Sequence, residues 1–177
     1  CIRDRNQTNE PSKDDPAKKP EYQVEEILGY SYTFDGNVVE RTVAGGVIAE
    51  TEEYSLVIYY FDDIEFDTWD NVTDLAFDQV RDAMYAAFRF YPTEQTNSTS
   101  SKTENNYGET ILKVSGTMEG DQTGEGTMNR QFIAFYYVTD ENHVRFCVGV
   151  PKDDSSASYA ALDAAMDTLI ENLKKAA

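Results

Sequence analysis

Apolar residues recur at helical spacing in two segments of the chain. In residues 72–91 they return at steps of three and four, the period of an amphipathic helix. Asn71 can cap the start of this helix, and Pro92 ends it. A second stripe predicts a helix over residues 156–175, and its members are Tyr159, Leu162, Met166, Leu169, Ile170 and Leu173.

Other apolar segments have the pattern of strands. Residues 54–61 form a nearly continuous apolar run, which indicates a central strand buried on both faces. Residues 110–118, 130–138 and 143–150 are separated by short turns, so they predict a three-stranded meander.

The remaining parts of the chain carry weaker patterns. Residues 22–49 predict two or three strands, with a hairpin turn at residues 35–37 (Asp-Gly-Asn). Residues 92–109 are rich in Thr, Ser and Asn and predict a mobile surface loop. The order strands, helix, strands, helix indicates an α+β fold. We expect an antiparallel sheet of about five or six strands, with helices 72–91 and 156–175 packed on it.

Charge and aromatic residues divide the chain into two parts. Residues 1–20 hold five basic and four acidic residues, three of the five prolines and no aromatic residue, which predicts a disordered linker. Residues 21–177 contain all the aromatic residues and are expected to form a single α+β domain. The whole chain has 15 Lys and Arg against 33 Asp and Glu, a net charge of -18. This charge excludes nucleic acid as a partner, because phosphate would be repelled.

The first residues resemble a known type of terminus. Cys1 is followed by about twenty polar, proline-bearing residues, and this arrangement resembles a mature bacterial lipoprotein. The resemblance implies a lipid on Cys1, prior removal of a signal peptide, and a location on the outer face of a bacterial membrane or at the cell surface. The alternative is that the first residue of the sequence is a cysteine by chance.

The second half of the domain resembles a known fold. The segments ILKVSGTMEG, RQFIAFYYV and VRFCVGV, together with the closing helix, are similar to the PsbP-like α+β fold. This fold occurs in many secreted and lipid-anchored bacterial proteins. The likeness implies a fold only, and it assigns no catalytic or binding residue.

An acidic belt precedes and enters the first predicted helix. Residues 42–80 contain ten carboxylates and neither Lys nor Arg. The densest part suggests a weak Ca²⁺ site, because oxygen ligands gathered on a loop suit a hard cation. Its candidate ligands are Asp62, Asp63, Glu65, Asp67 and Asp70. The spacing does not match an EF-hand loop, and a solvated acidic surface is the favoured interpretation. A docking face for a basic partner is the other alternative.

Further constellations have simpler interpretations than catalysis. His143 and Cys147 lie on one predicted strand about 13 Å apart, too far for direct contact. Cys147 is expected to be a buried, inert thiol. The glycines of residues 116–126 fit a hairpin turn rather than a phosphate loop. Adjacent tyrosines on a strand point to opposite faces of the sheet, as in the pairs Tyr59–Tyr60 and Tyr136–Tyr137. The second face either exposes an aromatic strip or is covered by a helix, and a covering helix is the favoured interpretation.

No catalytic residue and no cofactor is assigned from the sequence. The leading hypothesis is a lipid-anchored extracytoplasmic protein, a non-enzymatic binding or interaction module. It would be attached to the membrane through Cys1 and bind an unknown protein or envelope ligand. The alternatives are a carboxylate-dependent hydrolase acting on envelope or extracellular substrates, and a passive subunit of a larger complex.

Overall fold

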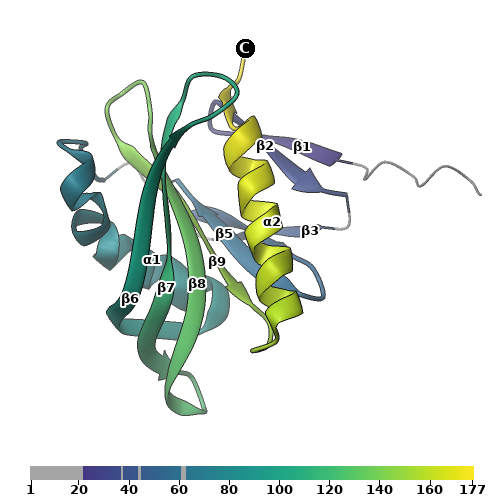
Figure 1. Ribbon diagram of the computed structural model, residues 1–177, viewed down its shortest axis with the longest axis vertical. Helices are drawn as coiled ribbons and strands as arrows, with labels where there is room; N and C mark the ends of the chain where they lie inside the picture. Colours follow the sequence, from purple (N-terminus) through teal and green to yellow (C-terminus); the bar gives the residue numbers. More distant parts are fainter. Residues whose placement is uncertain (1–21, 37, 44, 61–62) are drawn as a thin grey trace, which may run out of the picture.

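Two antiparallel sheets and two long helices form the structure, a computed structural model that describes residues 22–36, 38–43, 45–60 and 63–177 (Figure 1). The α+β class expected from the sequence is confirmed. In chain order the elements are β1 (Tyr22–Ile27), β2 (Tyr30–Asp35), β3 (Val39–Val43), β4 (Gly46–Glu50), β5 (Tyr54–Tyr59), the 3-10 helix η1 (Trp69–Asn71), α1 (Val72–Phe88), β6 (Phe90–Glu104), β7 (Thr110–Gln122), β8 (Gly126–Val138), β9 (Val144–Pro151), α2 (Ser156–Asn172) and β10 (Lys174–Lys175).

The larger sheet has seven strands in the order β3-β4-β5-β9-β8-β7-β6, and the smaller has three in the order β1-β2-β10. β7, β8 and β9 form the predicted meander. β5 is buried along its length and pairs with β9, which confirms its predicted central place.

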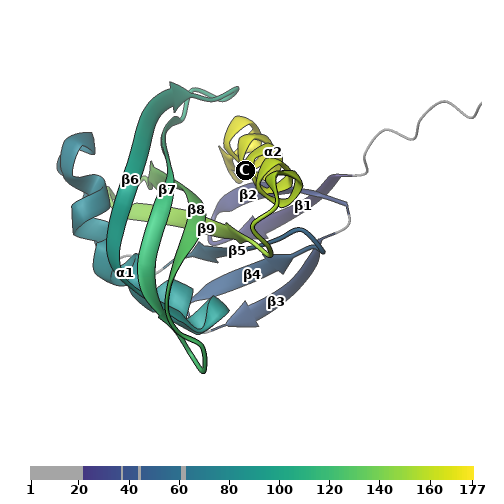
Figure 2. The same ribbon diagram turned by 60° about the horizontal axis from the view of Figure 1, so that its bottom comes forward.

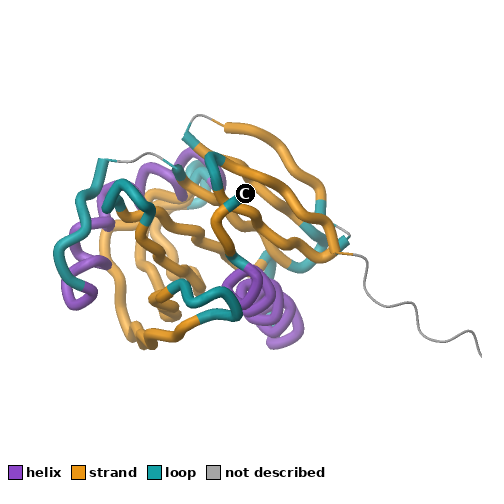
Figure 3. The backbone as a smooth tube through the Cα atoms, turned by 90° about the horizontal axis from the view of Figure 1, so that it is seen from above, coloured by secondary structure: helices purple, strands orange, loops and turns teal. Residues whose placement is uncertain are grey.

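The large sheet is covered on both faces. α1 packs on one face, where its buried side chains meet Val148 and Tyr136 of the sheet. β2 and α2 cover the other face, where Tyr32 and Met166 pack with Tyr137 and Cys147. Figure 2 shows the two helices on opposite sides of the sheet, and Figure 3 shows its strands running between them. The adjacent residues Tyr136 and Tyr137 therefore point into different cores, as favoured from the sequence.

A glycine allows α2 to pack closely on the sheet. At Gly149 of β9, a Cβ atom would lie 2.6 Å from Leu162 Cδ1 and 2.8 Å from Met166 Cε, both on α2. A side chain here would require the ends of the Leu162 and Met166 side chains to shift. α2 is also held from β7, because Lys113 Nζ donates to the carboxylates of Asp163 and Asp167 at 2.7 Å each. Neither α-helix among the described residues is long and apolar enough to cross a membrane.

The two sheets have seven and three strands, more than the five or six expected, and α2 ends at Asn172 rather than at residue 175. Three further sequence predictions about local structure are wrong. Residues 92–109 are not a loop: β6 runs through residue 104 and pairs with β7. β6 is the last strand of the sheet, so its polar side chains can face solvent and carry no alternating apolar signal. α1 ends at Phe88 rather than at residue 91, because Arg89 adopts a left-handed conformation (φ 55°) and donates its N–H to the Tyr85 carbonyl.

The third correction concerns residues 35–37, which do not form a hairpin. β2 pairs with β1 and β10, whereas β3 pairs with β4, so the segment after β2 connects two different sheets. An Asp-Gly-Asn pattern predicts a turn, and a turn is compatible with either arrangement. The sequence pattern therefore could not distinguish a hairpin from a crossing between sheets.

Candidate functional site

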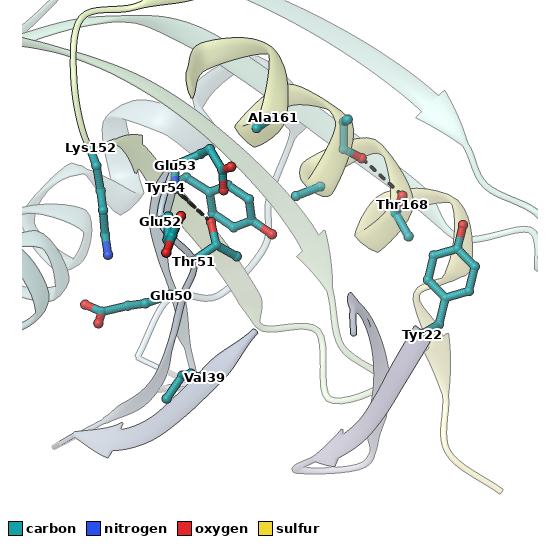
Figure 4. Close-up of a pocket in the computed structure, with 12 residues that line it drawn as sticks. Tyr22, Val39, Glu50, Thr51, Glu52, Glu53, Tyr54, Lys152, Ala161 and Thr168 are labelled. Atoms are coloured by element: carbon teal, nitrogen blue, oxygen red, sulfur yellow. Dashed lines mark hydrogen bonds between the residues drawn. The ribbon is translucent and has the colours of Figure 1, made fainter. Parts of the chain in front are cut away.

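A groove with a volume of about 880 Å³ lies between α2 and the ends of several strands. Its walls are α2, the turn between β4 and β5, the residue after β9, and the first residues of β1 and β3 (Figure 4). Figure 4 shows Lys152 and the turn glutamates on one side, with Ala161 and Thr168 of α2 on the other. We call this feature the α2 groove.

The α2 wall of the groove is made of small side chains. Ala161, Ala164, Ala165 and Thr168 follow the spacing i, i+3, i+4, i+7, so they share one side of the helix. Ala164 is exposed and its neighbours are half-buried. Because alanine extends only to Cβ, this side of α2 leaves room for a ligand where longer side chains would fill the space.

The opposite wall is a tight turn that presents three glutamates, Glu50, Glu52 and Glu53. Thr51 Oγ1 accepts hydrogen bonds from the backbone N–H groups of Glu53 and Tyr54, each at 3.2 Å. The backbone N–H of Lys152 donates to the Glu53 carbonyl at 2.8 Å, which joins the turn to the end of β9. The glutamates are therefore displayed on a backbone held at several points.

The lining combines apolar surface with negative charge. The exposed side chains of Tyr22 and Val39, together with the alanines of α2, supply the apolar surface. Glu52 and Glu53 are exposed, whereas Glu50 is half-buried and accepts from Arg41 Nη2 at 3.5 Å and from the Ser55 hydroxyl at 3.4 Å. Among the described lining residues, Lys152 is the one basic side chain.

Two further carboxylates, Glu25 and Glu40, lie where β1 approaches β3 and are not among the described residues that line the groove. Gln23 Nε2 donates to Glu25 at 3.0 Å and to Glu40 at 3.4 Å. Burial raises the pKa of the Glu40 carboxyl, and the nearby charge of Glu25 raises it further. A raised carboxyl pKa next to another carboxylate marks a region of excess negative potential.

The side chains that line the α2 groove determine which groups it can hold. Neither His nor Cys is present among the described residues that line the groove. The lining offers apolar contact area, hydroxyl groups and carboxylates, which together can hold a positively charged group that carries an apolar portion.

Cys147 and His143, the residues examined for nucleophilic or metal chemistry, lie elsewhere. Cys147 is fully buried in the core under α2, with its Sγ 3.9 Å from Met166 Sδ, so the expected buried thiol is confirmed. Burial raises the pKa of the Cys147 thiol well above its usual value, which keeps it protonated and unreactive. His143 forms an antiparallel bridge with Glu65, and its Nδ1 lies 3.9 Å from Glu141 Oε2.

The acidic loop before α1 is partly described. Asp62 lies outside the described residues, and Asp63, Glu65, Asp67 and Asp70 are exposed. Backbone hydrogen bonds anchor the loop to the turn before β9: the Phe66 N–H donates to the Asn142 carbonyl, and the Val144 N–H donates to the Ile64 carbonyl. Within the described ranges no three His, Cys, Asp or Glu side chains gather as metal ligands. The Ca²⁺ site stays a prediction, as does the lipid on Cys1, which also lies outside the described residues.

Sequence reasoning did not single out the α2 groove. Glu50, Glu52 and Glu53 were counted within the acidic belt, but no pattern in the sequence brings them to α2. The alanine stripe of α2 was the available signal. The periodic pattern of this helix is dominated by its large apolar residues, which enter the core. The alanines lie on the other side of the helix and add little to that pattern.

Comparison with known proteins identifies a fold and no family. No protein-family model matches the chain, and no curated protein sequence matches it. The solution structure of cyanobacterial PsbP (CyanoP) from Synechocystis is similar with a TM-score of 0.50 at 14% sequence identity, covering 91% of this chain and 96% of that one. The crystal structure of the Saccharomyces cerevisiae Ran-binding protein Mog1p matches with a TM-score of 0.49 at 9% identity, covering 89% and 96%. The PsbP-like fold expected from the sequence is thus supported.

Proposed function

We propose that this domain is a non-catalytic binding module whose α2 groove takes a positively charged, partly apolar segment of a protein partner. The single observation that carries the proposal is the pairing of three glutamates with an alanine-lined helix wall across one groove of about 880 Å³. A Lys or Arg side chain matches both features, because its aliphatic stem can lie on the alanines while its charged end reaches the carboxylates.

The charge of the whole domain supports this choice of ligand. The chain has a net charge of -18, and three glutamates line the groove. A cationic segment would relieve the repulsion among these groups and would be attracted from a distance. An anionic ligand would have to overcome the same field.

The hydrolase alternative from the sequence would also have to use these glutamates. Glu50 is engaged with Arg41 and Ser55, which leaves Glu52 and Glu53 on an exposed turn. Water is not excluded from such a turn. Binding is therefore the function that this geometry supports best.

Peptide selection tests the proposal. We expect a displayed library of random peptides, panned on the domain, to be enriched in Lys and Arg next to apolar residues. Ala164→Trp should abolish binding of the selected peptides by filling the groove. Ala160→Trp is the matched control, since Ala160 is an exposed residue of the same helix outside the groove.

Charge variants supply the second half of the test. Glu52→Gln with Glu53→Gln should weaken binding about tenfold, because each exposed ion pair contributes up to about 1 kcal/mol. Glu119→Gln with Glu125→Gln removes the same charge from exposed positions on the β7–β8 hairpin and should leave affinity within twofold. Selected peptides without enrichment in basic residues, or binding unchanged by Ala164→Trp, would refute the proposal.

A further inference from the structure

A second groove lies on the other side of the molecule, where η1 and the first half of α1 pass β6. It consists of two adjoining cavities of about 240 and 300 Å³. Thr73 of α1 and the β6 residues Gln95 and Ser98 line both cavities, so the two form one continuous depression. We call it the α1–β6 groove.

Two irregularities in β6 shape this groove. The pairing of β6 with β7 shifts register between Pro92 and Glu94 and again between Thr96 and Thr99. The residues skipped by these shifts include Thr93 and Ser98, and both line the groove. A β-bulge bends a strand and changes the direction of its side chains, and such bulges are frequent beside functional sites.

The second bulge depends on a glycine in the neighbouring strand. Asn97 has a positive φ of 50°, and the bulge lies directly against Gly116 of β7. A Cβ atom at Gly116 would be 2.9 Å from Ser98 Cα and 3.0 Å from the Thr96 carbonyl oxygen. The position of Ser98 is therefore set by the bulge in β6 and by the absence of a side chain at Gly116 of β7.

The helix side presents aromatic rings at a regular interval. Trp69, Thr73, Phe77 and Arg81 are spaced by four residues, which places them along the side of η1 and α1 that faces β6. Trp69 packs against Phe66, with 5.0 Å between ring centroids. The Arg81 guanidinium lies 4.9 Å from the Phe77 ring centroid. Each of the two rings is thus held by a neighbouring side chain, and Trp69 and Phe77 lie eight residues apart in the sequence.

Arg81 also connects the helix to the strand. Its Nε donates to the Pro92 carbonyl at 3.0 Å, and its guanidinium lies 5.2 Å from the Tyr91 ring centroid. Arg81 is therefore held between two aromatic rings. Side-chain contacts therefore hold both the helix wall and the strand wall of the groove in place.

We propose that the α1–β6 groove binds a neutral oligosaccharide. The lining includes five hydroxyl side chains from both elements and the Gln95 amide, which can each donate and accept hydrogen bonds as sugar hydroxyls require. The two aromatic side chains offer faces for the apolar C–H surface of a sugar ring.

Charge narrows the class of glycan. Asp70, Asp74 and Glu94 line the groove, against one lysine, Lys102. This balance opposes sulfated or uronic-acid polymers. Only Leu112 and Val114 add aliphatic side chains to the lining, so the groove lacks the apolar pockets that a peptide side chain would need.

Titration with defined saccharides tests this proposal. The probes are hexasaccharides of β-1,4-linked glucose, xylose and N-acetylglucosamine, with binding followed by calorimetry. We expect saturable one-site binding of at least one probe. Phe77→Ala should weaken it at least tenfold, whereas Tyr107→Ala, which removes an exposed aromatic residue elsewhere, should leave it unchanged.

A second pair of variants covers the case in which Phe77→Ala fails to fold. Ser98→Trp blocks the groove from an exposed position and should abolish binding, and Thr103→Trp on the same strand lies outside the groove and should not. Absence of saturable binding for all three hexasaccharides would overturn the proposal. So would binding that survives Ser98→Trp, or occupation of this groove by the cationic peptides selected on the α2 groove.

Discussion

Two buried tyrosines join the small sheet to the large one. The hydroxyl groups of Tyr32 in β2 and Tyr137 in β8 are hydrogen-bonded to each other within the core under α2. Arg145 of β9 adds a second connection, since its Nη1 donates to the Leu28 carbonyl at 2.8 Å, in the turn between β1 and β2. These contacts fix the small sheet, and with it Tyr22 at the edge of the α2 groove.

Tyrosine burial predicts how stability depends on pH. Burial raises the pKa values of Tyr32, Tyr136 and Tyr137 above the ordinary value of about 10. A group whose folded pKa is raised contributes stability that is fully present below its unfolded pKa and is lost as pH rises toward the folded value. The free energy of unfolding should therefore fall above about pH 10, by up to about 1.4 kcal/mol per pH unit for each such tyrosine.

Denaturant titrations across the alkaline range check this prediction. In Tyr136→Phe the slope of stability against pH should be shallower than in the wild type by the share of one tyrosine, about 1.4 kcal/mol per unit. Tyr22→Phe, at an exposed position, should reproduce the wild-type slope. An unchanged slope in Tyr136→Phe would show that burial of this side chain does not hold its proton.

One asparagine holds the C-terminal end of α2. Asn105 Nδ2 donates to the carbonyls of Ile170 at 2.9 Å and Leu173 at 2.7 Å, while its Oδ1 accepts from the backbone N–H groups of Tyr107 and Glu109 at 3.0 Å each. Two hydrogen bonds thus connect the turn after β6 to the end of α2, and two more hold the turn itself. The position of the whole helix, including its groove side, depends on this residue.

We expect Asn105→Ala to destabilise the domain by about 2–4 kcal/mol, because it leaves several part-buried backbone groups without their partner. Asn106→Ala is the adjacent control at an exposed position and should cost less than about 0.5 kcal/mol. Chemical denaturation of both variants provides the measurement. A cost for Asn105→Ala no larger than that of the control would contradict the assigned role.

At the level of elements, the sequence predicted those with a clear period and missed those without one. Both helices and the β7–β9 meander have apolar side chains at intervals that reflect burial on one or both faces. β6 has no such interval, because it lies at the edge and most of its side chains face water. Its pairing is dictated by β7, a partner that no local pattern reveals.

The candidate sites were hidden for the same reason. The α2 groove joins Glu52 with Ala164, and the α1–β6 groove joins Phe77 with Ser98, in each case across elements that the fold brings together. The sequence showed the acidic belt and the small helix residues separately. Their relation depends on which face of the large sheet each helix covers.

For the molecule as a whole, the uncharged part of the lining distinguishes the two grooves, because the described lining of each holds three carboxylates and one lysine. The net charge of -18 raises the negative potential around the entire domain. In the α2 groove this potential adds to three local glutamates and an apolar helix wall, which favours a cationic segment. The α1–β6 groove instead offers many neutral hydrogen-bonding groups, so its ligand is selected by shape and hydroxyl pattern.

The most direct test of the account is a map of backbone amide NMR shifts during titration with a selected cationic peptide. We predict that the perturbed amides form one continuous patch over Thr51–Tyr54 and Ala161–Thr168. We also predict that the patch disappears in Ala164→Trp and persists in Ala160→Trp. Perturbations centred on α1 and β6, or scattered over the acidic surface without saturation, would contradict the assignment of the α2 groove as the binding site.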